Sequence, residues 1–141
     1  MENREMGRIQ NRELRTGNGR GRKRDICGRT FAFALRVVKL CKHLNEQSVV
    51  DRALVNQLIR AGTSIGANVE EAQSAQSRAD FLSKISIACK EARETLYWLR
   101  LISASEQSIT DDMASIVRQA DELIAILTTI INNTKENINA S

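Results

Sequence analysis

The sequence predicts an all-α fold, an antiparallel up-down-up-down four-helix bundle that follows a disordered basic tail. Four long segments repeat apolar residues at alternating spacings of three and four, which places those residues on one side of a helix. The 141 residues include no proline, the residue that most disrupts helix interiors. No segment alternates apolar and polar residues between turn-forming dipeptides, so the sequence gives no indication of a strand.

Composition divides the chain into a tail, residues 1–25, and a bundle domain, residues 26–141. The tail is polar and contains glycines, and it cannot bury enough apolar surface to offset the entropy lost on ordering. It carries eight basic and four acidic side chains, which account for the whole net charge of +4. The 13 basic and 13 acidic residues of the bundle domain cancel. The domain is therefore expected to be neutral and the tail positive.

The first helix is expected from about Arg29 to Gln47. Phe31, Leu35 and Val38 add apolar surface on its flank. Its main apolar stripe comprises Ile26, Thr30, Phe33, Val37, Leu40 and Leu44.

The second helix is expected from Val49 or Asp51 to about Ser74, with Asp51 placed favourably for the helix dipole. Gly62 and Gly66 lie inside it, although each mid-helix glycine costs about 1 kcal/mol relative to alanine. Close approach to another helix accounts for such a pair, and Ala88 and Ala92 of the third helix are the expected neighbours. Asn68 falls on the apolar stripe, where a buried amide needs hydrogen-bond partners. Fixing the helix register is the favoured role for Asn68, and a ligand contact is the alternative.

The third and fourth helices each follow a capping sequence. Ser77 is positioned to cap the third helix, which is expected to end near Ser103. Ser108, followed by acidic residues, marks the start of the fourth helix, expected from about Ile109 to Asn137.

The third helix carries more apolar surface than one core stripe needs. Ile87, Trp98 and Leu101 lie outside the stripe that faces the bundle core. Exposed apolar surface of this kind usually marks association. These three residues are therefore the predicted interface of a homo-oligomer.

Catalytic, cofactor-binding and metal-binding residues are all predicted to be none. The single histidine, His43, lacks a Glu-x-x-His context, and the three cysteines are too far apart in sequence to suggest a metal site. Because the N-terminus lacks an apolar secretory region, the cysteines are expected to be reduced thiols and the protein to be cytoplasmic. No apolar run approaches the roughly 20 residues that span a bilayer, so no membrane association is expected. The carboxylates of Glu70, Glu71, Glu91 and Glu94 are expected to form a solvated or subunit-bridging ionic cluster with basic neighbours.

Two groups of basic residues are candidate contacts for nucleic-acid phosphates. The tail supplies Arg20, Arg22, Lys23 and Arg24, and the first helix supplies Arg36, Lys39 and Lys42. No aromatic residue is interleaved in the tail for base stacking. The tail is thus expected to contact the phosphate backbone, or to be simply solvated.

Several motifs together resemble a bacterial four-helix-bundle family related to proteins encoded in intervening sequences of 23S ribosomal RNA genes, some of them labelled S23 ribosomal proteins. The resemblance covers about Thr30 to Asn133, and the basic tail has no expected counterpart. The motifs are Gly62–Asn68, Glu70–Ala72, Asp80–Phe81, Lys90–Thr95 and Tyr97–Leu101, with Phe33–Leu40 resembling the family's first helix.

The resemblance implies a non-enzymatic, self-assembling helical scaffold that associates with RNA or DNA. Members of the wider family are similar to the accessory protein of diversity-generating retroelements, a pentameric barrel that engages a reverse transcriptase and nucleic acid. A pentamer is therefore the expected homo-oligomer. The alternative is a protein-binding adaptor, similar to a reverse-transcriptase accessory protein, that does not contact nucleic acid.

Overall fold

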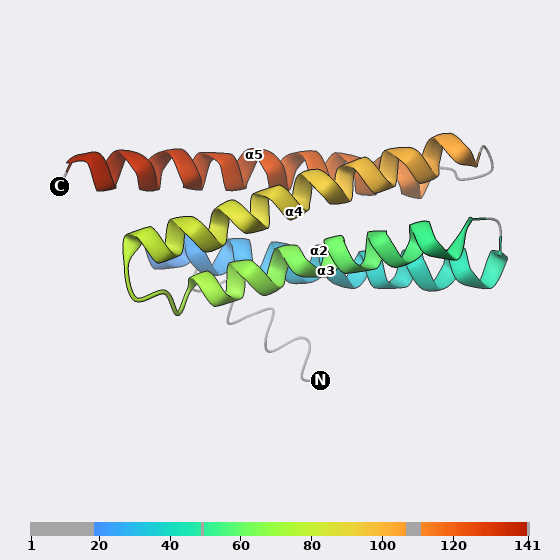
Figure 1. Ribbon diagram of the computed structural model, residues 1–141, viewed down its shortest axis with the longest axis horizontal. Helices are drawn as coiled ribbons and strands as arrows, with labels where there is room; N and C mark the ends of the chain where they lie inside the picture. The colour runs from blue at the N-terminus through green and yellow to red at the C-terminus, as the bar shows by residue number, and fades with distance from the viewer. Residues whose placement is uncertain (1–18, 49, 107–110, 141) are drawn as a thin grey trace.

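The computed structural model describes residues 19–48, 50–106 and 111–140, and these residues form four helices (Figure 1). Each helix runs antiparallel to the one before it, so the predicted up-down-up-down four-helix bundle is confirmed. Within the described ranges there is no strand. The helices are α2 (Gly19–Gln47), α3 (Arg52–Ala72), α4 (Arg78–Ser105) and α5 (Asp111–Ala140).

The helix ends follow the expected local chemistry. The Asp51 carboxylate accepts a hydrogen bond from the Ala53 amide at 2.8 Å, and Ser77 Oγ accepts one from the Asp80 amide at 3.0 Å. Each side chain thus satisfies an amide that has no partner within its helix. The turn after α2 contains Ser48 in the left-handed region, with φ of 53°. The start predicted at Ser108 for the last helix lies outside the described residues.

Helix α2 begins at Gly19 rather than near Arg29, so residues 19–25 of the predicted tail belong to the helix. Residues 1–18 lie outside the described part of the chain. Arginine and lysine are good helix formers, and extending an existing helix is far easier than nucleating one. An ion pair between Arg29 and Asp25 at 3.3 Å supports this N-terminal extension.

The longer helix concentrates positive charge on one element. Within α2, Arg20, Arg22, Lys23, Arg24, Arg29, Arg36, Lys39 and Lys42 are opposed only by Asp25 and Glu46. Residues 48–141 carry nine basic and twelve acidic side chains. The bundle is therefore polarised, although the count over residues 26–141 is neutral.

The core lies along the inner stripes of all four helices. Its large, fully buried side chains include Val37, Leu58, Ile85 and Leu127. The two buried polar residues bond within their own helices: Thr30 Oγ1 donates to the Ile26 carbonyl at 2.8 Å, and Thr95 Oγ1 to the Glu91 carbonyl at 2.7 Å. Within the described ranges, every buried side-chain nitrogen and oxygen has a partner. The interior is thus apolar without an unsatisfied group.

Helix α3 packs extensively against both α2 and α4, and α4 packs against α5, whereas the contact between α2 and α5 is sparse. Arg36 bridges that last contact: its Nη1 donates to Gln119 Oε1 at 2.8 Å and its Nη2 to the Asp112 carbonyl at 3.4 Å. No Cα atom of α2 lies within 8 Å of one of α4 in the described ranges, so these two helices occupy diagonal corners of the bundle. Their outer faces are therefore separate surfaces.

The two mid-helix glycines of α3 face α2 and not the third helix. A Cβ atom at Gly62 would lie 2.8 Å from Val37 Cγ1, and one at Gly66 would lie 3.4 Å from the Thr30 carbonyl. The expected packing of these glycines against Ala88 and Ala92 is wrong. The prediction of a close approach was right, but helical spacing does not say which neighbour lies opposite a small residue.

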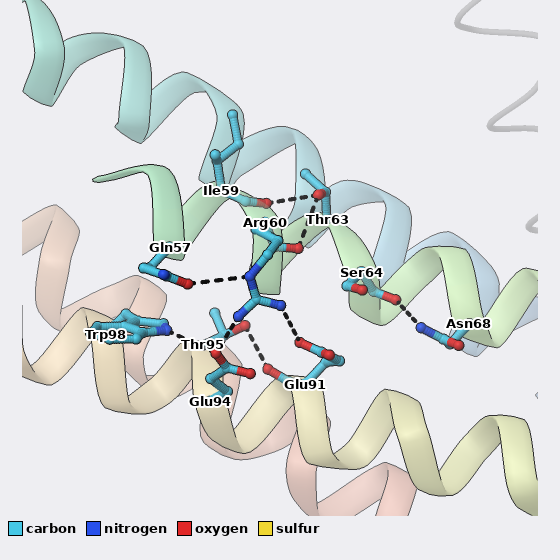
Figure 2. A network of polar contacts seen from close by, with 10 residues as sticks. All are labelled: Gln57, Ile59, Arg60, Thr63, Ser64, Asn68, Glu91, Glu94, Thr95 and Trp98. Carbon is cyan, nitrogen blue, oxygen red and sulfur yellow. Dashed lines mark hydrogen bonds and ion pairs between the residues drawn. The ribbon is translucent and has the colours of Figure 1, made fainter. Parts of the chain in front are cut away.

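Asn68 satisfies its amide locally. Its Nδ2 donates to the Ser64 carbonyl at 2.9 Å, one turn earlier in α3, and the side chain is half-buried (Figure 2). This bond lies within one helix, so it does not itself set the register between helices.

Candidate interaction surfaces

The outer face of α4 exposes three large apolar side chains. Ile87 is 39% exposed, Tyr97 55% and Leu101 37%. Trp98 is half-buried and packs against the core, and its ring meets Tyr97 edge-on with centroids 5.1 Å apart. Two of the three predicted interface residues, Ile87 and Leu101, are thus accessible, while Trp98 lies partly beneath the surface.

An open hollow extends this face onto α5. It has a volume of about 620 Å³ and is lined from α4 by Tyr97, Arg100 and Leu101. Ala114 and Val117 line it from α5. The face therefore offers both protruding apolar side chains and a shallow apolar depression beside them.

A polar network borders the α4 face where α3 meets α4 (Figure 2). Arg60 of α3 donates from Nη1 to Glu91 Oε2 at 3.4 Å, and its Nη2 pairs with Glu94 Oε1. Trp98 Nε1 donates to the same Glu94 oxygen at 3.3 Å. Gln57 Oε1 accepts from Arg60 Nε at 3.2 Å. The network thus fixes the indole and both carboxylates in place.

The acidic residues singled out in the sequence pair largely across α3 and α4. Glu91 and Glu94 share Arg60, and Glu71 accepts from Lys84 Nζ at 2.8 Å. Glu70 lies near Cys27, where its charge helps to raise the pKa of that thiol. Glu71, Glu91 and Glu94 thus form ion pairs, as expected, and these pairs join α3 to α4 within one chain.

The outer face of α2 exposes a second apolar patch. Phe31 is 68% exposed, Leu35 46% and Val38 39%. Lys39 and Lys42 beside it are also exposed. Sequence reasoning noted the three apolar residues only as added surface and proposed no role for them. Their spacing of four and three, offset from the core stripe of the same helix, is the pattern that identifies a second contact face.

The candidate phosphate-binding residues separate into three groups. Arg36 is engaged with α5 through Gln119 and Asp112, so its guanidinium is already hydrogen-bonded. Lys39 and Lys42 are exposed on α2. The remaining four belong to the first turns of α2, and their side chains lie outside the described part: Arg20, Arg22, Lys23 and Arg24.

The three cysteines are not in disulfides. Burial raises the pKa of the Cys41 thiol to about 11, and burial followed by the charge of Glu70 raises the pKa of Cys27. Cys41 Sγ donates to the Val55 carbonyl at 3.8 Å, across the contact between α2 and α3. A raised pKa keeps a thiol protonated, and the thiolate is the reactive form. Cys27 and Cys41 are therefore poor nucleophiles near neutral pH.

Two further searches concern the described residues only. They contain no group of three or more His, Cys, Asp or Glu side chains arranged to hold a metal ion. Of the helices described, none combines the length and apolar character needed to span a membrane. His43 is an exposed residue of α2.

Comparisons with known proteins identify the family. The family model described as 23S rRNA-intervening sequence protein matches residues 22–129. A crystal structure from Bacteroides thetaiotaomicron VPI-5482, described as a protein with unknown function from the S23 ribosomal protein family, is 44% identical. The match covers 75% of this chain and 97% of that chain, with a TM-score of 0.70. A search of curated proteins finds no match. Because the family model spans most of the sequence, the protein belongs to the 23S rRNA-intervening sequence protein family.

Proposed function

We propose that the protein is a non-enzymatic helical scaffold of the cytoplasm that assembles with copies of itself and associates with RNA. The observation that carries self-assembly is the α4 face, where Ile87, Tyr97 and Leu101 stand exposed beside an apolar hollow. Removing apolar surface from water contributes about 25 cal/mol per Å². Association through α4 would bury these side chains and the hollow together.

The RNA part of the proposal rests on the charge of α2. The N-terminal turns of this helix hold Arg20, Arg22, Lys23 and Arg24, and the family takes its name from an intervening sequence of 23S rRNA. Phosphate contacts release counterions and give affinity without sequence preference. Binding through this end of α2 is therefore expected to be salt-sensitive and tolerant of sequence.

Light scattering on the purified protein tests self-assembly. The expected mass is a multiple of 15.8 kDa, five-fold by resemblance to the pentameric relatives. Ile87→Lys combined with Leu101→Lys is expected to give monomers, because each ammonium would have to be buried in the contact. Ser86→Lys adds one such ammonium group at another exposed position of α4 and should leave the mass unchanged. A monomeric parent, or a double variant of unchanged mass, would contradict assembly through this face.

Fluorescence anisotropy with a labelled single-stranded RNA of about 20 nucleotides tests the RNA part. Replacing Arg20, Arg22, Lys23 and Arg24 together by Gln should reduce the slope of log affinity against log salt by about 3, at roughly 0.7 per phosphate contact. The control is a protein that lacks only residues 1–18, because it separates the contribution of the segment before α2 from that of the four basic residues. Undiminished binding by the four-residue variant would contradict the assignment, and absence of binding by the parent would leave the adaptor function.

A protein-binding adaptor is the second candidate function, and one observation favours it. The centre of α2 exposes Phe31, Leu35 and Val38, and apolar side chains contribute nothing to a phosphate contact. Helix α2 therefore carries a surface that phosphate contacts do not explain.

A further inference from the structure

The unexplained surface is a continuous stripe along α2. Cys27, Phe31, Leu35 and Val38 follow one another at spacings of four, four and three, the spacing by which one helix packs on another. From Phe31 to Val38 the stripe is about 10 Å long at 1.5 Å per residue. Cys27 is half-buried, and exposure among the other three is greatest at Phe31. Helix α2 thus presents one apolar stripe to the core and another outward.

Positive charge accompanies the outward stripe. Lys39 and Lys42 are exposed at its C-terminal end, and within the described residues neither has a hydrogen bond or an ion pair. A surface complementary to this face is therefore apolar along its middle and acidic beside Lys39 and Lys42.

A second copy of this chain does not provide such a surface. Another α2 would bring together two helices that each carry eight basic and two acidic residues. The exposed side of α4 is apolar but carries Lys90, Arg93 and Arg100. Helix α5 has an acidic surplus, yet its described residues include no exposed large apolar side chain. Like charges or missing apolar contacts therefore oppose each pairing.

An anionic bilayer fits less well than a helix. Three apolar side chains over about 10 Å are a small area to insert, and stable membrane attachment needs more than one weak anchor. The narrow stripe matches the width of a single helix face instead.

We propose that the outer face of α2 binds an acidic amphipathic helix of another protein. The partner helix places apolar residues at spacings of three and four over Phe31, Leu35 and Val38. Its flanking Asp or Glu side chains reach Lys39 and Lys42. This contact uses the corner of the bundle diagonal to α4, a different surface from the α4 face to which self-assembly is assigned.

A designed peptide tests the proposal directly. The probe has three heptads with Leu at the first and fourth positions and Glu at the flanking positions, and its matched control has Lys in place of every Glu. Fluorescence anisotropy of the labelled peptide with the full-length protein at physiological salt measures binding. The acidic peptide is expected to bind with Kd on the order of 10 µM and the lysine peptide at least tenfold more weakly.

Two variants of α2 separate the apolar and charged parts of the contact. Leu35→Ser should weaken binding of the acidic peptide about tenfold, because it removes a central apolar contact. Lys39→Glu with Lys42→Glu should weaken it by a similar factor and reverse the preference toward the lysine peptide. Lys135→Glu, at an exposed position of α5, is the control and should leave the affinity for the acidic peptide unchanged. Circular dichroism should show unchanged helicity for all of these variants.

Four outcomes would overturn the proposal. The first is absence of acidic-peptide binding up to about 100 µM, and the second is equal affinity for the two peptides. The third is binding to vesicles with about 30% phosphatidylserine that Leu35→Ser abolishes, since that assigns the face to a membrane. The fourth is a change of oligomer mass in the α2 variants, since that assigns the face to a second copy.

Discussion

Helix α3 joins its two neighbours in two different ways. Toward α2 it presents Gly62 and Gly66, and the helices approach so closely that an added Cβ at Gly62 would lie 2.8 Å from Val37 Cγ1. Toward α4 it presents Arg60, which reaches Glu91 and Glu94. Within the described residues no ion pair joins α2 to α3.

The comparison shows that small residues and long charged residues support helix packing in different ways. A glycine contact brings two helices close but leaves little room at the seam for long side chains. A contact between larger residues leaves an edge where arginine can reach across to two carboxylates. The first seam is therefore expected to depend on shape, and the second on both burial and charge.

The largest expected effect is at Gly62. Gly62→Leu should lower the free energy of unfolding by about 3 kcal/mol, because Cβ of Val37 and both of its methyl groups lie within 3.2 Å of the added Cβ and a valine is stiff at χ1. Urea denaturation followed by circular dichroism measures the loss. Gly28→Ala is the control: nothing lies within 4 Å of its added Cβ, so the variant should gain about 1 kcal/mol of helix propensity.

A double substitution tests the same contact between Gly62 and Val37 more strictly. Gly62→Ala combined with Val37→Ala should be more stable than the sum of the two single changes predicts, since the smaller residue 37 makes room for the new Cβ. Strict additivity, or a Gly62→Leu variant as stable as the parent, would show that the α2–α3 contact is not close in solution.

Substitutions in the charged contact between α3 and α4 are expected to lower the free energy of unfolding less. Arg60→Gln is expected to lower the free energy of unfolding by up to about 1 kcal/mol, because the guanidinium is half-exposed and solvent screens its pairs. The difference from the parent should shrink in molar salt. Trp98 emission should shift as Glu94 loses its anchor. Arg100→Gln is the comparison, since Arg100 has no ion pair or hydrogen bond within the described part, and an equal loss there would refute the network's role.

A substitution in the turn between α2 and α3 is expected to have a smaller effect on stability, and to raise it instead of lowering it. Ser48 has a φ of 53°, a conformation that costs a non-glycine residue energy and glycine very little. Ser48→Gly should therefore stabilise the protein by about 0.5 kcal/mol, after the loss of the Ser48 Oγ bond to the Asn45 carbonyl. A higher urea midpoint with an unchanged slope would support this, whereas a lower midpoint would not.

The last predicted effect is a loss of stability at alkaline pH, and it is absent near neutral pH. Cys41 lies in the α2–α3 seam, and burial raises its pKa to about 11 from the ordinary 9.0. Between these values the unfolded chain loses the proton and the native chain keeps it, so stability should fall as pH rises from about 9 to 11. The raised pKa of Cys27 acts in the same direction. Cys41→Ala should reduce the decline but not remove it, and an identical decline in both proteins would contradict the assignment.

Much of this architecture could be predicted from sequence because helix formation is largely local. Spacing placed four helices, and the cap at Ser77 was correctly located since a capping side chain bonds an amide two or three residues away. Asp51 was expected only to suit the helix dipole, and it proved to cap α3. The ionic cluster was predictable as a set of charges, and Arg60 proved to be the residue that holds Glu91 and Glu94. The start of α2 was missed, because polar composition alone does not show whether a helix propagates into a basic segment.

The sequence by itself determined the helices, the stripe of each that is buried, and the excess of apolar residues on α4, because all three follow from residue spacing along one helix. Only the tertiary structure decided that Gly62 faces Val37, that Arg36 is occupied by Gln119, and that the Phe31 face remains uncovered. An apolar stripe on a helix is wide enough for several neighbours. Which neighbour occupies each side depends on how all four helices pack together, and no single segment contains that information.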